Sequence, residues 1–115
     1  MSDAASTAAA TDILLHSRDA RGVHTLTLNT PKAFNVLSEA MLAALQTAID
    51  AVAADPLARA VVMAASGRAF CAGHNLKEMR AHGDMAYFQK LFADCTRVML
   101  GLQNEREWVA FCDKV

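Results

Sequence analysis

The pattern of hydrophobic and polar residues predicts two short strands near the start of the chain, at 13–17 and 23–28. In the second stretch, every other residue lies on one face of a pleated strand, so His24, Leu26 and Leu28 share a face. The five residues between the stretches end in Gly22, which suits a tight turn. The pattern predicts a β-hairpin.

A helical spacing follows the loop 29–32, where Pro31 lacks a backbone donor. Ser38 is placed to cap the helix and Glu39 to supply an acid in its first turn. Hydrophobic residues then recur at intervals of three and four, which predicts one helix over about 38–54. These residues are Met41, Leu42, Leu45, Ala48, Ile49 and Val52.

The second half of the sequence predicts a buried strand at 60–65, a tight glycine loop at 67–73 and a short helix at 75–80. Asp84 is placed to cap a last helix. The apolar stripe of that helix is wider than a surface helix needs, so another element is expected to cover it. The stripe comprises Tyr87, Phe88, Leu91, Phe92, Cys95, Val98, Met99 and Leu102.

The order strand, strand, helix, strand, helix predicts an α/β domain with a short mixed sheet and flanking helices. We expect three regions: a disordered leader at 1–11, a partial domain at 12–103 and a divergent tail at 104–115. In the tail, Trp108 and Phe111 have the spacing to anchor a helix against the apolar stripe. Packing, not base stacking, is the predicted role of those two residues.

The composition of the chain argues against several classes of partner. The chain has 115 residues, 54% of them hydrophobic and 20% charged, which fits one globular domain. A formal net charge of -1 with interspersed signs argues against nucleic acid and anionic membranes as partners. The three cysteines form no C-x-x-C pair, and neither His16 nor His82 has a second ligand at metal spacing. A cytoplasmic protein without a metal is predicted.

Two segments carry a specific resemblance. Residues 67–79 read Gly-Arg-Ala-Phe-Cys-Ala-Gly-His-Asn-Leu-Lys-Glu-Met, and residues 28–37 read Leu-Asn-Thr-Pro-Lys-Ala-Phe-Asn-Val-Leu. Both resemble motifs of the enoyl-CoA hydratase (crotonase) family, in register and with the expected helix between them. The likeness runs from about Ile13 to Gln103. It implies the N-terminal half of a crotonase-like fold, which binds acyl-CoA thioesters, and coenzyme A enters only as part of the substrate.

The resemblance also implies a site. The backbone N–H of His74 is carried over as a donor to the substrate carbonyl oxygen, and Gly73 permits close approach of the ligand. The helix beginning near Asn75 directs its positive end toward the same place. Lys32 and Ala33, with the chain around Ala72, Gly73, Asn75 and Leu76, are implied contacts of coenzyme A.

His74 and Asn75 depart from the family pattern, which commonly has a small residue followed by Asp. The His74 imidazole is a candidate general base, and Cys71 a candidate nucleophile beside it. The favoured interpretations are a side chain directed away from the substrate and a thiol that fills the loop. Lys77, Glu78 and Arg80 are interpreted as a solvated face, with Glu78 and His82 spaced to pair.

Family members continue past the position of Gln103 with an apolar strand and a Gly-rich turn that carries a second donor. The catalytic acids follow that turn. The tail at 104–115 has no Gly-rich turn, and Glu105 and Glu107 are interpreted as solvated helix residues instead of displaced catalytic acids. We therefore expect a truncated or frame-shifted product without hydratase turnover.

Three hypotheses remain open. The first is a protein related to enzymes that hydrate or isomerise an enoyl-CoA thioester, expected to be a homo-oligomer if folded. The second is a non-catalytic interaction fragment that self-associates, or pairs with a full-length relative, through the stripe at 87–102. The third is a fragment that has no stable fold of its own. The reaction type is left open, because one crotonase-like fold serves several chemistries.

Overall fold

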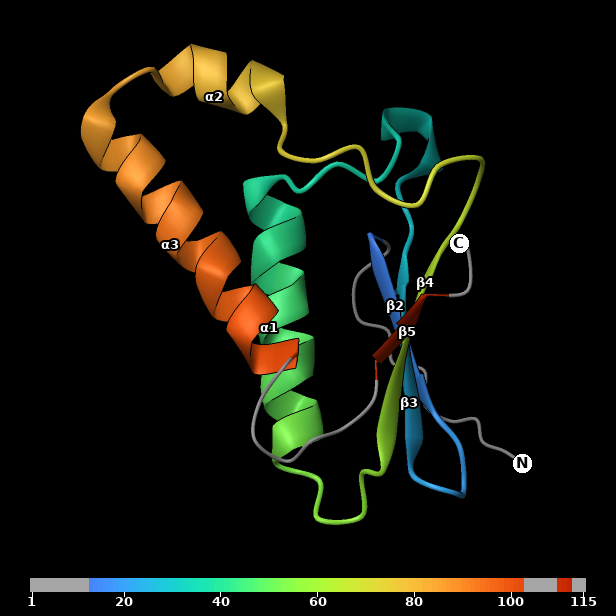
Figure 1. Ribbon diagram of the computed structural model, residues 1–115. Coiled ribbons are helices and arrows are strands. Elements are labelled where there is room, and N and C mark those ends of the chain that lie inside the picture. The colour runs from blue at the N-terminus through green and yellow to red at the C-terminus, as the bar shows by residue number, and fades with distance from the viewer. Residues whose placement is uncertain (1–12, 103–109, 113–115) are drawn as a thin grey trace.

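The computed structural model describes residues 13–102 and 110–112 (Figure 1). Four strands form one mixed sheet in the order β2-β3-β4-β5. The strands are β2 (Leu14–Arg18), β3 (Val23–Leu28), β4 (Ala60–Ala65) and β5 (Ala110–Cys112). The pair β2 and β3 is the predicted antiparallel hairpin, whereas β4 runs parallel to β3, and β5 runs parallel to β4. The predicted α/β fold with a short mixed sheet is confirmed.

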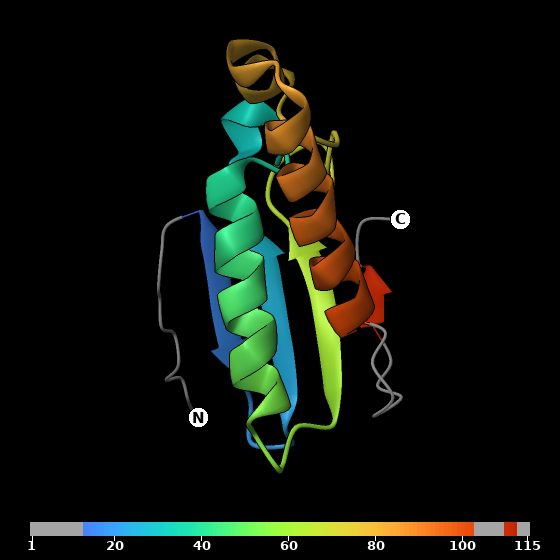
Figure 2. The same cartoon turned by 90° about the vertical axis from the view of Figure 1, so that its left-hand side faces the viewer.

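Helices cover one face of this sheet (Figure 2). The helix α1 (Glu39–Ala53) lies beside α3 (Met85–Leu102), and the short α2 (Leu76–His82) joins the loop region to α3. A single turn of 3₁₀ helix, η1 (Pro31–Ala33), interrupts the loop after β3. The helix predicted at 38–54 is confirmed, and Ser38 caps it by accepting a hydrogen bond from the Met41 amide at 3.1 Å.

The hydrophobic core lies between α1 and the inner face of β3 and β4. The burial of β3 alternates as predicted, so His24, Leu26 and Leu28 are buried. All six predicted apolar positions of α1 are buried as well. Fully burying a Leu, Ile, Val or Met side chain stabilises the fold by about 1.5–3 kcal/mol. Burial of these positions therefore holds α1 against the sheet.

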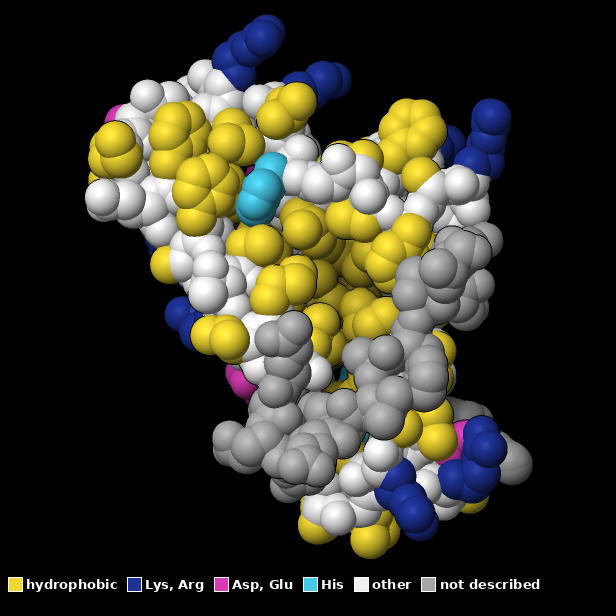
Figure 3. Space-filling view, viewed as in Figure 1, with side chains coloured by type: hydrophobic (Ala, Val, Ile, Leu, Met, Phe, Trp, Pro, Cys, Tyr) yellow, Lys and Arg dark blue, Asp and Glu magenta, His cyan; other side chains and the backbone are white. Residues whose placement is uncertain are grey.

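The last helix packs on α1, with Leu91 and Val98 buried, and it leaves two residues of its apolar stripe, Phe92 and Met99, exposed. Phe92, Met99 and Leu100 are 45%, 41% and 61% exposed, respectively. Figure 3 shows hydrophobic side chains gathered over α3 and in the hollow between α3 and the sheet. Phe92 and Met99 of the stripe, with the neighbouring Leu100, are therefore left uncovered by the described residues.

The tail requires a correction. Phe111 lies in β5, so the helix expected around Trp108 and Phe111 is wrong at that position. Strand β5 pairs with β4 from Val61↔Ala110 to Met63↔Cys112, and it thereby satisfies backbone groups at the edge of β4. The leader at 1–11, Glu105, Glu107 and Trp108 lie outside the described residues. The expectations made for them stay predictions.

Candidate active site

The two motif segments meet because β3 and β4 are parallel and in register. Leu28 and Ala65 are partners at the end of the two strands, so the loops that follow leave the same edge of the sheet. The Ser66 amide donates to the Leu28 carbonyl at 2.9 Å, which holds the second loop against the first at its start. Sequence segments that are far apart therefore build one surface.

Asn35 joins these loops from inside. Its side chain is fully buried, with 0% exposure, and its backbone has a left-handed φ of 54°. The Oδ1 atom accepts from the Thr30 amide at 2.7 Å, while Nδ2 donates to the carbonyls of Ser66 and Ala69, both at 2.9 Å. Asn tolerates the left-handed region better than most residues. This residue therefore sets the turn of the first loop and holds the second loop to it.

The bend at Ala72–His74 is tied to the first loop by backbone hydrogen bonds on both sides of Gly73. The Ala72 amide donates to the Phe34 carbonyl at 3.0 Å, and the Leu37 amide donates to the Gly73 carbonyl at 2.7 Å. Gly73 has a φ of 104°, which favours glycine, and a Cβ added there meets no atom within 4 Å. The bend thus needs glycine for its backbone conformation and leaves open space beside it.

The His74 amide is one donor that this bend leaves available. Within residues 13–102 and 110–112, no hydrogen bond to this N–H is present, whereas the Ala72 amide and the Gly73 carbonyl are paired. An unpaired amide beside open space is able to bind a carbonyl oxygen, because backbone N–H groups need an acceptor. The sequence prediction assigned the donor role to the same group.

The His74 side chain points elsewhere. Its ring packs against Phe92, with ring centroids 5.3 Å apart, and it lines a cavity of ≈ 300 Å³ along α3. The Nδ1 atom is buried and has no hydrogen-bond partner in the described part of the chain. A general base is normally oriented by such a partner. The geometry therefore gives the imidazole no orienting group for that role.

Asn75 begins α2 as its N-cap. The Oδ1 atom accepts from the amides of Lys77 at 3.0 Å and Glu78 at 3.1 Å, which leaves less of this side chain for a ligand. The substitution of Asn for the family's Asp is compatible with this role, since both side chains are good N-caps. Leu76, next in the chain, is 73% exposed.

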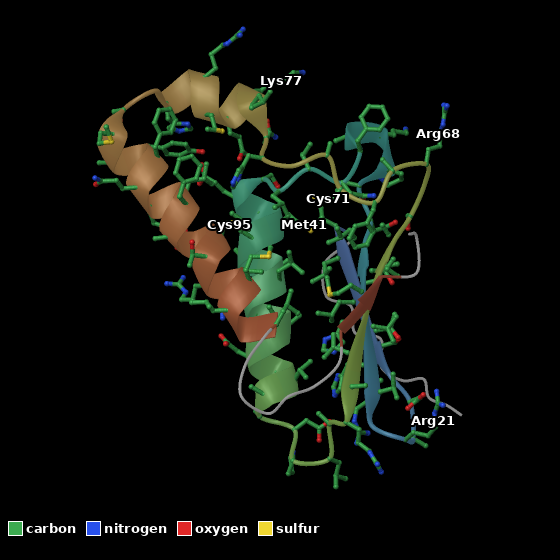
Figure 4. All side chains as sticks on the ribbon, in the orientation of Figure 1. Arg21, Met41, Arg68, Cys71, Lys77 and Cys95 are labelled. Atoms are coloured by element: carbon green, nitrogen blue, oxygen red, sulfur yellow. The ribbon has the colours of Figure 1, made fainter. Side chains whose placement is uncertain are left out.

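The remaining implied contacts of coenzyme A lie at the same end of the molecule. Lys32 and Ala33 belong to η1, and both are exposed, as is Ala72 on the adjoining loop. Figure 4 shows Arg68 and Lys77 pointing away from the body of the molecule at this end. The fold therefore brings the predicted ligand contacts together at one exposed end, on two adjoining loops.

The cysteines of this region do not form a catalytic pair with His74. Cys71 and Cys95 are free thiols that pack against the hydrophobic core (Figure 4). Burial, and secondarily the neighbouring Cys71, raise the pKa of the Cys95 thiol. No hydrogen bond joins Cys71 to an imidazole in the ranges that the structure describes. The interpretation of Cys71 as a packing residue agrees with these contacts.

The charged cluster on α2 is only partly a solvated face. Lys77 and Arg80 are exposed, but the Glu78 carboxylate accepts a hydrogen bond from the Glu39 amide at 3.0 Å. His82 bonds to the backbone carbonyl of Glu78 at 2.9 Å instead of pairing with its carboxylate. The predicted Glu78–His82 side-chain pair is therefore wrong, because the N-terminus of α1 attracts the acid.

Sequence reasoning missed two groups of residues. Asn35 was visible in the first motif, yet no role was predicted for its side chain. At the opposite end of the molecule, a hydrogen-bonded chain connects Arg18, Asp55, His24 and His16. A histidine on the buried face of a strand was the available signal for this chain. Its partners come from β2 and the end of α1, so the spacing in the sequence does not reveal them.

Two further properties bear on function. No cluster of three or more His, Cys, Asp or Glu side chains suited to a metal ion occurs among the described residues. None of the described helices combines the length and apolar character needed to cross a bilayer.

Comparisons with known proteins give the family. A family model for enoyl-CoA hydratase/isomerase matches residues 23–109, which carries the likeness past Gln103. Enoyl-CoA hydratase domain-containing protein 3 of Xenopus laevis is 37% identical over 83 residues, which make up 72% of this chain and 28% of that protein. The human protein of the same name is 33% identical over 88 residues.

Comparisons with solved structures indicate the same family. The chain matches an enoyl-CoA hydratase of Mycobacterium smegmatis with 59% identity and a TM-score of 0.83, over 87% of this chain and 38% of that one. The structure of human enoyl-CoA hydratase domain-containing protein 3 matches with a TM-score of 0.77 at 29% identity. The chain therefore spans well under half the length of these relatives. It belongs to the enoyl-CoA hydratase/isomerase family and has the fold of that family's N-terminal half.

Proposed function

We propose that this chain provides the thioester-binding part of a site that acts on enoyl-CoA substrates, by hydration or by isomerisation. The observation that carries the proposal is the His74 amide, which lies in a glycine bend beside open space without a partner among the described residues. Several relatives are named for enoyl-CoA hydratases, and one, from Escherichia coli, is named 1,2-epoxyphenylacetyl-CoA isomerase.

The proposed chemistry is stabilisation of negative charge on the thioester oxygen. Such charge develops when water adds to the conjugated double bond or when a base removes a proton beside the thioester. A donor that is fixed before the reaction contributes about 3–4 kcal/mol to the transition state. Here Gly73 and the hydrogen bonds to Phe34 and Leu37 fix the orientation of the His74 N–H.

The proposed coenzyme A contacts use the exposed groups around this bend. The charge of Lys32 is available for a phosphate, and Ala72 and Leu76 are exposed beside the bend, where the adenine and phosphate portion is proposed to bind. Ala33, Gly73 and Asn75 complete the proposed surface. No separate cofactor enters this proposal, and a cytoplasmic location is proposed from the unpaired cysteines.

We further propose that the chain alone does not hydrate crotonyl-CoA. The bend supplies the His74 amide as the proposed donor, but no acid is poised beside it in this proposal. Glu78 of α2 accepts from the Glu39 amide, and Glu39 of α1 accepts from the Tyr87 hydroxyl, so both carboxylates already have partners. The test is a spectrophotometric hydration assay with purified protein of verified mass. No turnover is expected, together with weak binding of crotonyl-CoA, and turnover at ordinary enzyme rates would contradict the proposal.

A second candidate function is a non-catalytic fragment that associates through α3. The exposed side chains of Phe92, Met99 and Leu100 favour it, because exposed apolar patches promote association. Binding of a second copy would give a homo-oligomer, and binding of a full-length relative would give a mixed one. Size-exclusion chromatography with light scattering tests this, and a monomer at high concentration would argue against it.

A further inference from the structure

Two histidines and an aspartate form a continuous hydrogen-bonded chain at the end of the molecule opposite the candidate site. His24 lies on the buried face of β3, and its side chain is 5% exposed. Its Nε2 is 2.9 Å from Asp55 Oδ2, and its Nδ1 is 2.9 Å from His16 Nε2. Arg18 Nε donates to the same Asp55 oxygen at 2.7 Å. The chain links β2 and β3 to the turn that follows α1.

The number of protons that this series of hydrogen-bonded side chains can hold is limited. An ionised carboxylate only accepts hydrogen bonds, so the His24 nitrogen that faces Asp55 carries a hydrogen. The contact between the two rings then holds one hydrogen, donated either by His16 or by His24. If both rings were cationic, two N–H groups would face each other with the ring centroids 5.1 Å apart. The contact therefore tolerates one positive charge and opens on uptake of a second.

The surrounding elements supply little to offset a second charge. Asp55 is the carboxylate that faces the pair, and the adjacent Arg18 is itself positive. In the hairpin turn, Asp19 pairs with Arg21. The strand β4 has no titratable side chain.

Two more charged residues lie on the neighbouring elements. Arg59 packs beside Gly22, and Asp50 of α1 accepts a hydrogen bond from Gln46. Neither residue makes a hydrogen bond with the two histidines among the described residues. A doubly protonated pair is therefore not compensated in the described part of the chain.

We propose that His16, His24 and Asp55 form a proton-sensitive latch, which links β2 and β3 to the turn after α1 at neutral pH and opens at the His16–His24 contact when both rings are protonated. The latch is independent of acyl-CoA binding. Burial, and secondarily the charge of His24, lower the pKa of His16. Because the folded state then binds fewer protons than the unfolded state, the stabilisation is complete above about pH 6.5 and is lost as the pH falls below that value.

Amide hydrogen exchange on the full chain, corrected for intrinsic rates, tests the latch. Protection of the β2 amides from Leu14 to Arg18 is expected to fall as the pH drops below about 6.5, by up to about tenfold per pH unit for one additional proton. Protection in the first turns of α1, from Glu39 to Leu45, is expected to change much less. Equal loss in both elements, or no protection of β2 at neutral pH, would overturn the proposal.

Two glutamine variants separate the latch from general acid sensitivity. His16→Gln retains an N–H donor toward His24 but takes up no proton, so the pH dependence of β2 protection is expected to disappear. His82→Gln changes an exposed histidine on α2, and this variant is expected to retain the pH dependence of β2 protection. An unchanged pH dependence in His16→Gln would contradict the proposal.

Imidazole NMR on the unmodified chain gives a second test if the His16→Gln variant does not fold. The His16 ring is expected to titrate below the midpoint of the histidines in the urea-unfolded chain. A His16 transition at the unfolded midpoint would overturn the latch.

Discussion

Replacing Asn35 with Ala removes the side chain that joins the two loops of the candidate site. The Thr30 amide and the Ser66 and Ala69 carbonyls lose their partner. Each buried group left without a partner costs about 1–3 kcal/mol. Water recovers part of this cost, since Thr30, Ser66 and Ala69 are only half-buried. Ala also adopts the left-handed backbone at φ 54° at a cost of about 1 kcal/mol.

These contributions predict that Asn35→Ala lowers the free energy of unfolding by about 3 kcal/mol. Urea unfolding followed by circular dichroism measures the loss. Phe34→Ala is the matched control, because Phe34 shares the left-handed conformation at φ 56° but its side chain is 54% exposed. A change within about 0.5–1 kcal/mol is expected for the control. A loss below about 1 kcal/mol for Asn35→Ala, or an equal loss for both variants, would refute the reasoning.

Three further perturbations have clear expected outcomes. Asn75→Ala removes the N-cap of α2, so the free energy of unfolding is expected to fall by about 1 kcal/mol. The Lys77 and Glu78 amides are expected to exchange faster with solvent, and unchanged exchange would contradict the capping role. The hydrogen bond to Glu39 raises the pKa of Tyr87 to about 12. Tyr87 is the only tyrosine of the chain, so ultraviolet titration measures its pKa directly. The titration midpoint is expected to shift toward pH 10 in Glu39→Gln, and an unchanged midpoint would contradict the hydrogen bond. The His24 hydrogen bond lowers the pKa of Asp55 to about 2, so the stability that this carboxylate provides should be lost as the pH falls from 3.8 toward 2. In Asp55→Asn, the free energy of unfolding should no longer depend on pH in this range. A pH dependence that persists in the variant would point to other acids.

Local signals predicted the elements well. Ser38 and the apolar spacing after it define α1 almost residue by residue, and the alternation around His24 defines β3. The position of the bend at Gly73 also followed from the motif. These features depend on neighbours within a few residues, which the sequence displays directly.

Contacts between distant segments were harder to predict. The buried amide of Asn35 bonds to residues more than thirty positions away, and nothing near it in the sequence marks those partners. The Glu78 carboxylate bonds to the start of α1, a contact that the spacing within α2 conceals. Phe111 joins the sheet because the edge of β4 offers backbone partners, which outweighs the helical spacing of the tail.

The orientation of the His74 amide toward a thioester oxygen is tested most directly by NMR, which detects even weak binding. Uniformly ¹⁵N-labelled chain is titrated with crotonyl-CoA carrying ¹³C at the thioester carbonyl, and Gly73→Ala, whose backbone disfavours a φ of 104°, is titrated in parallel. The His74 amide proton and the labelled carbonyl are both expected to move downfield and to saturate together, with the response lost in the variant. Saturable binding that leaves the His74 amide unmoved, or no response of residues 72–76 at any concentration, would contradict the account.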